Sequence, residues 1–126
     1  VGGKGKIEAR NKTFKAGQIL ENAGITFGLI TDAPFVPIEG QLLQAALYVK
    51  NGLSREMALK CLTINNAIIT DVDSRVGSLE PGKDADVVIW DVEPLATLSQ
   101  AGIVIIDGQI AYRRKAGESN VDYQKL

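Results

Sequence analysis

An amphipathic helix pattern runs almost directly into a nearly continuous apolar segment, and this pairing restricts the fold more than any other feature of the sequence. The apolar segment is residues 25–31, Ile-Thr-Phe-Gly-Leu-Ile-Thr, and Asp32-Ala33-Pro34 ends it. Such a run is typical of a strand covered on both faces, as in a parallel sheet. The apolar residues before it fall on one helical face: Ala16, Ile19, Leu20 and Ala23. Thr13 is placed to cap this helix and Gly24 to end it, so the pattern predicts helix then strand in an α/β layer structure.

Three more helical segments are predicted between this strand and residue 70. The first has an apolar stripe from Leu42 to Val49 and ends at Asn51-Gly52, where glycine can adopt a left-handed conformation. Ser54 is placed to cap the second, with Glu56 in its first turn. The inward residues of this second helix are Met57, Ala58, Cys61 and Leu62. Residues 63–69 form the third segment.

The pattern changes from helical to β near Val76. Residues 80–83, Glu-Pro-Gly-Lys, have the composition of a type II turn, and residues 86–91 predict a short strand. Residues 103–106 and 109–113 flank Asp107-Gly108, the dipeptide favoured in two-residue hairpins. The β region therefore predicts part of a sheet whose other strands lie elsewhere, followed by a polar tail.

Composition excludes several classes of function. The chain has 14 Lys and Arg against 15 Asp and Glu, a net charge of −1, which gives no broad field for binding nucleic acid or anionic lipid. No apolar run reaches the length of a membrane helix, and the N-terminus lacks the pattern of a secretion signal. The single cysteine, Cys61, excludes an intrachain disulfide and favours a reducing compartment. We therefore expect a cytoplasmic protein.

The first residue is Val1 and the only methionine is Met57, so the chain does not read as an unprocessed translation product. Cleavage of a leader and cropping of a larger protein are both compatible with this observation.

Asp32 is the strongest candidate for chemistry. It ends the predicted parallel strand, and ligands of α/β sheets and barrels bind at the carboxyl ends of strands. A carboxylate at that position can bind a cation or move a proton. Alternatively, Asp32 only forms a turn by bonding to its own backbone. The position of Asp32 alone favours this simpler interpretation.

Other chemical features have simpler explanations. Residues 2–6, Gly-Gly-Lys-Gly-Lys, lack the spacing of a phosphate loop and are expected to form a basic loop. The acidic pairs Asp71/Asp73 and Asp84/Asp86 match no calcium-loop pattern. Cys61 is expected to be an inert core thiol, since the sequence contains no histidine to activate it.

Two motifs together resemble a known family. They are residues 30–34, Ile-Thr-Asp-Ala-Pro, and residues 75–91, Arg-Val-Gly-Ser-Leu-Glu-Pro-Gly-Lys-Asp-Ala-Asp-Val-Val-Ile-Trp-Asp. The chain resembles the C-terminal part of the metal-dependent amidohydrolase superfamily, most closely its imidazolonepropionase-related branch. Thr63-Ile64-Asn65 and the Asp107-Gly108 hairpin extend the resemblance over nearly the whole chain up to about Tyr112.

The resemblance implies a fold and a division of the chain. The fold is α/β: the last strand and following helices of a (β/α)₈ barrel, with the C-terminal strands of a composite β-sandwich. Residues 1–70 would belong to the barrel, residues 71–114 to the sandwich, and residues 115–126 to a polar tail. Residues 25–31 would be the eighth barrel strand.

The resemblance also implies a reaction. The family hydrolyses C–N bonds in cyclic or linear amides and amidines, with one or two divalent metals. Zinc is the first candidate, and iron and manganese are alternatives. The aspartate that matches Asp32 binds metal and takes a proton from the attacking water. The other metal ligands of the family, mostly histidines, are absent from this chain.

We therefore expect a catalytically incomplete fragment that binds no metal by itself. Its expected partners are the missing N-terminal part of the same protein, a small amide-type substrate, and further copies of itself. Two departures from the family pattern, Ala33 in place of His and Asn66 in place of Pro, leave a non-catalytic binding or assembly domain as the alternative. A free-standing module that binds a small molecule has only the apolar composition in its favour.

Overall fold

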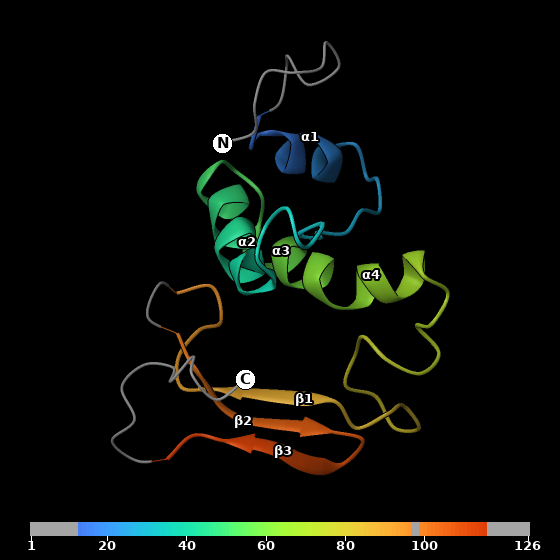
Figure 1. The fold of residues 1–126 in the computed structure, drawn as a ribbon. Helices are drawn as coiled ribbons and strands as arrows, with labels where there is room; N and C mark the ends of the chain where they lie inside the picture. The colour runs from blue at the N-terminus through green and yellow to red at the C-terminus, as the bar shows by residue number, and fades with distance from the viewer. Residues whose placement is uncertain (1–12, 97–98, 116–126) are drawn as a thin grey trace.

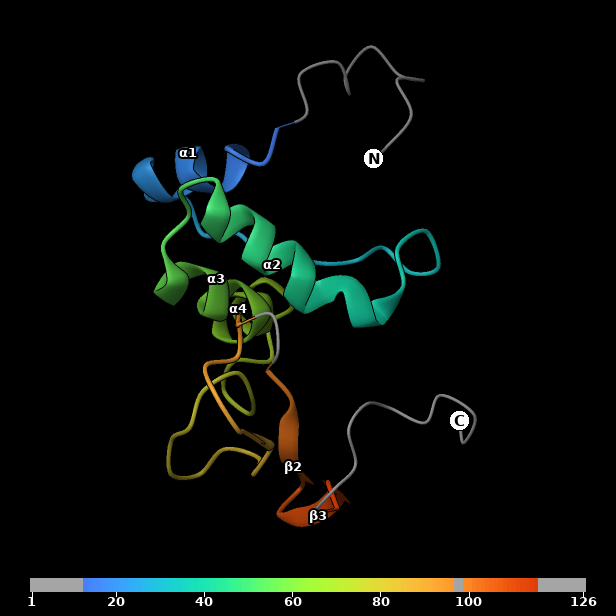
Figure 2. The ribbon, with the colours of Figure 1, turned by 90° about the vertical axis from the view of Figure 1, so that its left-hand side faces the viewer.

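A computed structural model describes residues 13–96 and 99–115. Its first part contains helices α1 (Ala16–Asn22), η2 (Ile38–Gly40), α2 (Gln41–Lys50), α3 (Arg55–Leu62) and α4 (Ile64–Ile69). Its second part is a sheet of β1 (Val87–Trp90), β2 (Ala101–Ile106) and β3 (Gln109–Arg113). Figures 1 and 2 both place the sheet on one side of the helices and α1 on the opposite side. The predicted order of helical and β segments is therefore confirmed, except at residues 25–31.

Local sequence signals explain the helix boundaries. The Ser54 hydroxyl accepts a hydrogen bond from the Met57 amide at 3.1 Å, which confirms Ser54 as the cap of α3. Gly24 and Gly52 end α1 and α2 with φ angles of 66° and 105°, as predicted. Thr13 differs from the prediction, because its hydroxyl accepts from the Lys15 amide at 3.2 Å in the turn before α1 and makes no bond inside the helix.

Residues 25–31 do not form a strand, and the prediction of one was wrong for the described chain. The segment lies against the helices, and the Leu29 amide donates to the Cys61 carbonyl at 3.1 Å. A strand requires a neighbouring strand to bond with. No described strand lies next to this segment. Helix groups bond instead to the Phe27 carbonyl and to the amide and carbonyl of Leu29.

The core lies between residues 25–31 and helices α2 and α3. Its buried residues are Leu29, Ala45, Leu53, Ala58, Cys61 and Leu95. Leu95 brings the segment before β2 against the helices, and the ion pair of Arg55 with Glu93, at 2.6 Å, joins the same two regions. Cys61 is fully buried, and this burial raises the pKa of its thiol, as expected for an inert core residue.

The sheet is antiparallel with the strand order β1-β2-β3. Asp107 and Gly108 have φ angles of 50° and 74°, which confirms the two-residue hairpin between β2 and β3. The Asp107 amide donates to the Asp86 carboxylate at 2.9 Å and so ties this hairpin to the start of β1. Every residue of β3 is exposed, and so are Val88 and Ile89 of β1. The sheet therefore presents apolar side chains that the described chain leaves uncovered.

The connection between α4 and the sheet contains the predicted turn. Gly82 has a φ of 92°, and the Lys83 amide donates to the Glu80 carbonyl at 3.2 Å, as a type II turn requires. Arg75 pairs with Asp84 at 2.6 Å across this connection. Within the part of the chain that the structure describes, no helix has the length and apolar character needed to cross a membrane.

Candidate functional site

Asp32 lies at the end of residues 25–31 and is exposed. Its φ of 56° is in the left-handed region, which Asp tolerates better than most residues. The Phe35 amide donates to the Asp32 main-chain carbonyl at 3.0 Å, so residues 32–35 form a turn. The preceding Thr31 is only 9% exposed. The carboxylate therefore extends from a fixed turn into solvent, where a ligand can reach it.

Three side-chain amides hold the segment that leads to Asp32. We call Gln41, Asn65 and Asn66 the amide cluster. The Phe27 carbonyl accepts from Asn65 Nδ2 at 2.9 Å, and the Leu29 carbonyl accepts from Gln41 Nε2 and Asn66 Nδ2, each at 3.1 Å. The cluster thus takes the place of a neighbouring strand along one edge of residues 25–31.

Sequence reasoning did not assign a role to the amide cluster. Asn65 belongs to a motif of the resemblance, Asn66 is a departure from it, and Gln41 precedes the first apolar residue of its helix. Two consecutive amides in a short, otherwise apolar helix are the available signal, because Asn65 is buried and a buried amide needs hydrogen-bond partners.

The described residues form no cluster of metal ligands around Asp32. Within residues 13–96 and 99–115, no group of three or more His, Cys, Asp or Glu side chains is placed to hold a metal ion. The Asp84 and Asp86 carboxylates are engaged separately, by Arg75 and by the Asp107 amide. The basic loop predicted at residues 2–6 and most of the polar tail lie outside the described residues.

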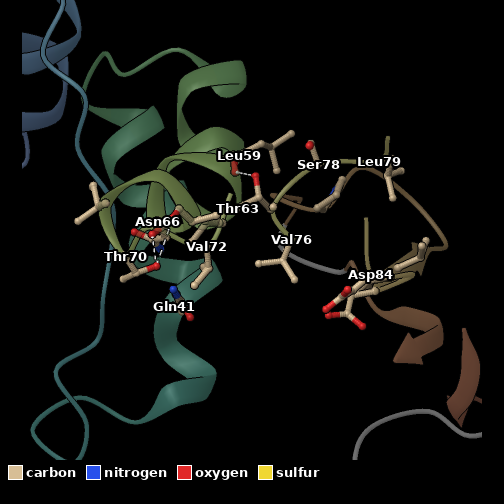
Figure 3. A pocket seen from close by; sticks show the side chains of 18 of the residues that line it. Gln41, Leu59, Thr63, Asn66, Thr70, Val72, Val76, Ser78, Leu79 and Asp84 are labelled. Carbon is tan, nitrogen blue, oxygen red and sulfur yellow. Dashed lines mark hydrogen bonds between the residues drawn. The ribbon is translucent and has the colours of Figure 1, made fainter. Parts of the chain in front are cut away.

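A cleft of about 950 Å³ opens between the helices and the connection to the sheet. Its walls are mainly apolar, and Figure 3 shows Gln41 and Asn66 on one side with Val76, Leu79 and Asp84 on the other. Ile30 also lines the cleft, whereas Asp32 does not. The cleft therefore adjoins the segment that carries Asp32, and the carboxylate lies outside it.

Comparison with known proteins assigns the family. The model of the amidohydrolase family matches residues 7–113. The chain belongs to this family. It is 34% identical over 103 residues to the amidohydrolase tasK of Hapsidospora irregularis, which covers 82% of this chain and 10% of that protein. It is 34% identical over 86 residues to an imidazolonepropionase of Shewanella baltica, which covers 64% of this chain and 21% of that protein.

A solved structure of this family has the same fold. The amidohydrolase from Thermotoga maritima superposes with a TM-score of 0.83 and 38% sequence identity, over 89% of this chain and 29% of that chain. The chain thus has an amidohydrolase-like α/β fold with a small antiparallel sheet. It spans less than a third of the length of each of these relatives.

Proposed function

We propose that this chain supplies one wall of the active site of a metal-dependent hydrolase, which cleaves C–N bonds other than peptide bonds in cyclic or linear amides or amidines. The observation that carries the proposal is the position of Asp32. Its carboxylate is exposed at the end of an apolar, tightly bonded segment, in an amidohydrolase-family chain. On this proposal, residues 25–31 stand in the place of the last strand of a (β/α)₈ barrel. The amide cluster bonds Phe27 and Leu29 along one edge of the segment, and a neighbouring strand would meet the opposite edge.

The side chains of this chain can supply one ligand to a metal ion, but not a complete metal site. Zinc sites in proteins take three or four protein ligands, usually imidazoles, thiolates and carboxylates. The chain has no histidine and its one thiol is buried in the core, so carboxylates are the donors that it can offer. Asp32 is the carboxylate at the end of residues 25–31. Zinc is the first candidate metal, with iron or manganese as alternatives. The remaining ligands would come from outside this chain, and the chain alone would be inactive.

Asp32 would also move the proton in the reaction. A bound divalent metal lowers the pKa of a water molecule toward neutrality, so that a carboxylate is a strong enough base to deprotonate it. The Asp32 carboxylate would hold the metal and accept this proton. The same carboxyl would then pass the proton to the leaving nitrogen. Its exposure leaves room for water and substrate to approach.

Substitution of Asp32 in the whole protein tests the proposal. We expect Asp32→Asn to lower the rate of ammonia or amine release from a panel of small amides by about 10²–10⁴-fold, because the base is lost. Glu39→Gln is the matched control, since Glu39 is another exposed carboxylate nearby in the chain. Equal effects of the two substitutions would contradict the proposal. A folded whole protein that hydrolyses none of the amides and binds no divalent metal would favour the non-catalytic binding or assembly domain.

A further inference from the structure

The main-chain groups of Leu29 are fully bonded without a neighbouring strand. The Leu29 amide donates to the Cys61 carbonyl of α3 at 3.1 Å. Its carbonyl accepts from Gln41 at the start of α2 and from Asn66 in α4, both at 3.1 Å. A carbonyl oxygen has two lone pairs, so this acceptor is saturated. Three helices therefore hold the two main-chain polar groups of Leu29.

Gly28 makes the Asn66 contact possible. A Cβ atom at position 28 would lie 1.7 Å from Asn66 Oδ1 and 2.9 Å from its Cγ. Real Cβ atoms do not come so close to another atom, so any larger residue at position 28 would push the Asn66 amide away. The Asn66 side chain thus lies directly across the backbone of the segment and reaches the next carbonyl. Gly28 and Asn66 form a matched pair.

Leu29 lies three residues before Asp32 in the sequence. Thr31, between them, is nearly buried, and the Phe35 amide fixes the Asp32 carbonyl from the other side. The backbone of Asp32 is therefore set between the bonded Leu29 carbonyl and the turn at residues 32–35. In Figure 3, the Gln41 and Asn66 side chains come from α2 and α4 to the same wall of the cleft.

We propose that Gln41 and Asn66 are positioning residues for Asp32: their amides hold the Leu29 carbonyl and so set the direction in which the Asp32 carboxylate meets its metal. This inference rests on the proposed function of Asp32 as a metal ligand. Groups that orient a metal ligand without touching the metal have measurable effects on affinity, because a misdirected ligand binds with poorer geometry.

Binding of Co²⁺ to the metal-free whole protein tests the inference without any substrate. The visible absorption bands of bound Co²⁺ report its coordination geometry, and their growth in a titration gives the dissociation constant. We expect Gln41→Leu and Asn66→Leu each to raise that constant about tenfold and to alter the bands. Asn51→Leu is the control, because Asn51 donates to the Leu47 carbonyl at 2.7 Å at the end of α2 and makes no bond to residues 25–31.

The Gly28–Asn66 pair provides a second and independent variant set. We expect Gly28→Ala to weaken Co²⁺ binding as Asn66→Ala does, because the added methyl group displaces the amide. The double variant should bind Co²⁺ about as well as Asn66→Ala alone, since the two changes remove one contact. If Asn66→Leu does not fold, Gln41→Leu provides the deciding measurement, because the Asn66 bond to Leu29 remains.

The Asp32→Asn variant distinguishes a failure of the positioning role from a failure of the proposed function. If it weakens Co²⁺ binding while Gln41→Leu and Asn66→Leu behave like Asn51→Leu, the positioning role is wrong and the proposed function stands. If Asp32→Asn leaves Co²⁺ binding unchanged, the proposed function is wrong and the positioning role with it. Weakened binding and altered bands in all three variants, with Asn51→Leu unchanged, support both.

Discussion

Ser54 shows how much structure a single side chain organises in this protein. Its hydroxyl accepts from the Met57 amide at 3.1 Å, which caps α3, and donates to Glu21 at the end of α1. Its own amide donates to the same carboxylate at 2.9 Å. One residue thus begins a helix and joins it to another one.

We expect Ser54→Ala to lower the free energy of unfolding by about 1 kcal/mol, the usual cost of a lost helix cap. Urea denaturation followed by circular dichroism measures the change. Ser74→Ala is the control, because Ser74 is exposed and lies outside the helices. Equal stabilities of the two variants would show that the cap contributes nothing.

The same contact makes stability depend on pH. The bonds from the Ser54 hydroxyl and amide hold the pKa of Glu21 below its ordinary value. A lowered pKa in the folded state stabilises the fold above the unfolded pKa, and this contribution is lost as the pH falls through the folded value. We therefore expect the wild-type protein to be more stable than Glu21→Gln at pH 7. The difference should begin to shrink below about pH 4.3, the unfolded pKa, and should be lost once the pH has fallen through the lowered pKa of folded Glu21. A difference that stays constant between pH 7 and pH 3 would contradict this.

At the scale of elements, α4 packs closely against the connection to the sheet. Gly77 has a φ of 94°, and a Cβ atom there would lie 2.7 Å from the Ala67 Cβ and 3.0 Å from the Ile64 Cα. Gly82 has a similar φ of 92°, yet no atom lies within 4 Å of its Cβ position. Substitution of Gly82 therefore measures backbone strain alone, whereas substitution of Gly77 measures strain together with steric overlap.

We expect both Gly77→Ala and Gly82→Ala to be destabilising, each by about 1–2 kcal/mol from the left-handed backbone. Gly77→Ala should lose about 1–3 kcal/mol more, because the methyl group overlaps α4. Thermal or urea unfolding of the two variants gives the comparison. A Gly82→Ala variant that is as unstable as Gly77→Ala would mean that α4 does not pack as described.

Structural features that depend only on residues close together in the sequence could be predicted from the sequence. The cap at Ser54 and the hairpin at Asp107-Gly108 follow from residue types at fixed spacing, and both are confirmed. Residues 25–31 have the composition of a strand, but a strand depends on partners distant in the sequence. The amide cluster was missed for the same reason, since Asn66 and Leu29 are 37 residues apart.

At the scale of the whole molecule, family membership is shown and the candidate site is incomplete. The position of Asp32 after an apolar segment could be read from the sequence, and its metal-binding role stays a prediction. The amidohydrolase family model covers residues 7–113, while the described residues contain no group of three metal ligands. Within the described residues, the sheet leaves apolar side chains exposed, among them Val88, Ile110 and Tyr112. Exposed apolar patches of this kind are typical of surfaces that bind another polypeptide.

We expect this chain, when produced by itself, to self-associate, because exposed apolar strands pair readily with other chains. Light scattering after size-exclusion chromatography measures the effect, and the mass should exceed that of one chain. Tyr112→Lys should lower the degree of association by adding a charge to β3, with Lys115→Gln as a control outside the strand. A stable monomer at high concentration would contradict the expectation.

A crystal structure of the whole protein soaked with Zn²⁺, with data collected at the zinc absorption edge, locates the metal relative to Asp32. We expect an anomalous peak at about 2.0–2.2 Å from an Asp32 carboxylate oxygen, the usual zinc–oxygen bonding distance. A zinc ion bound entirely by other residues, with the Asp32 carboxylate turned away from it, would show that Asp32 is not a metal ligand.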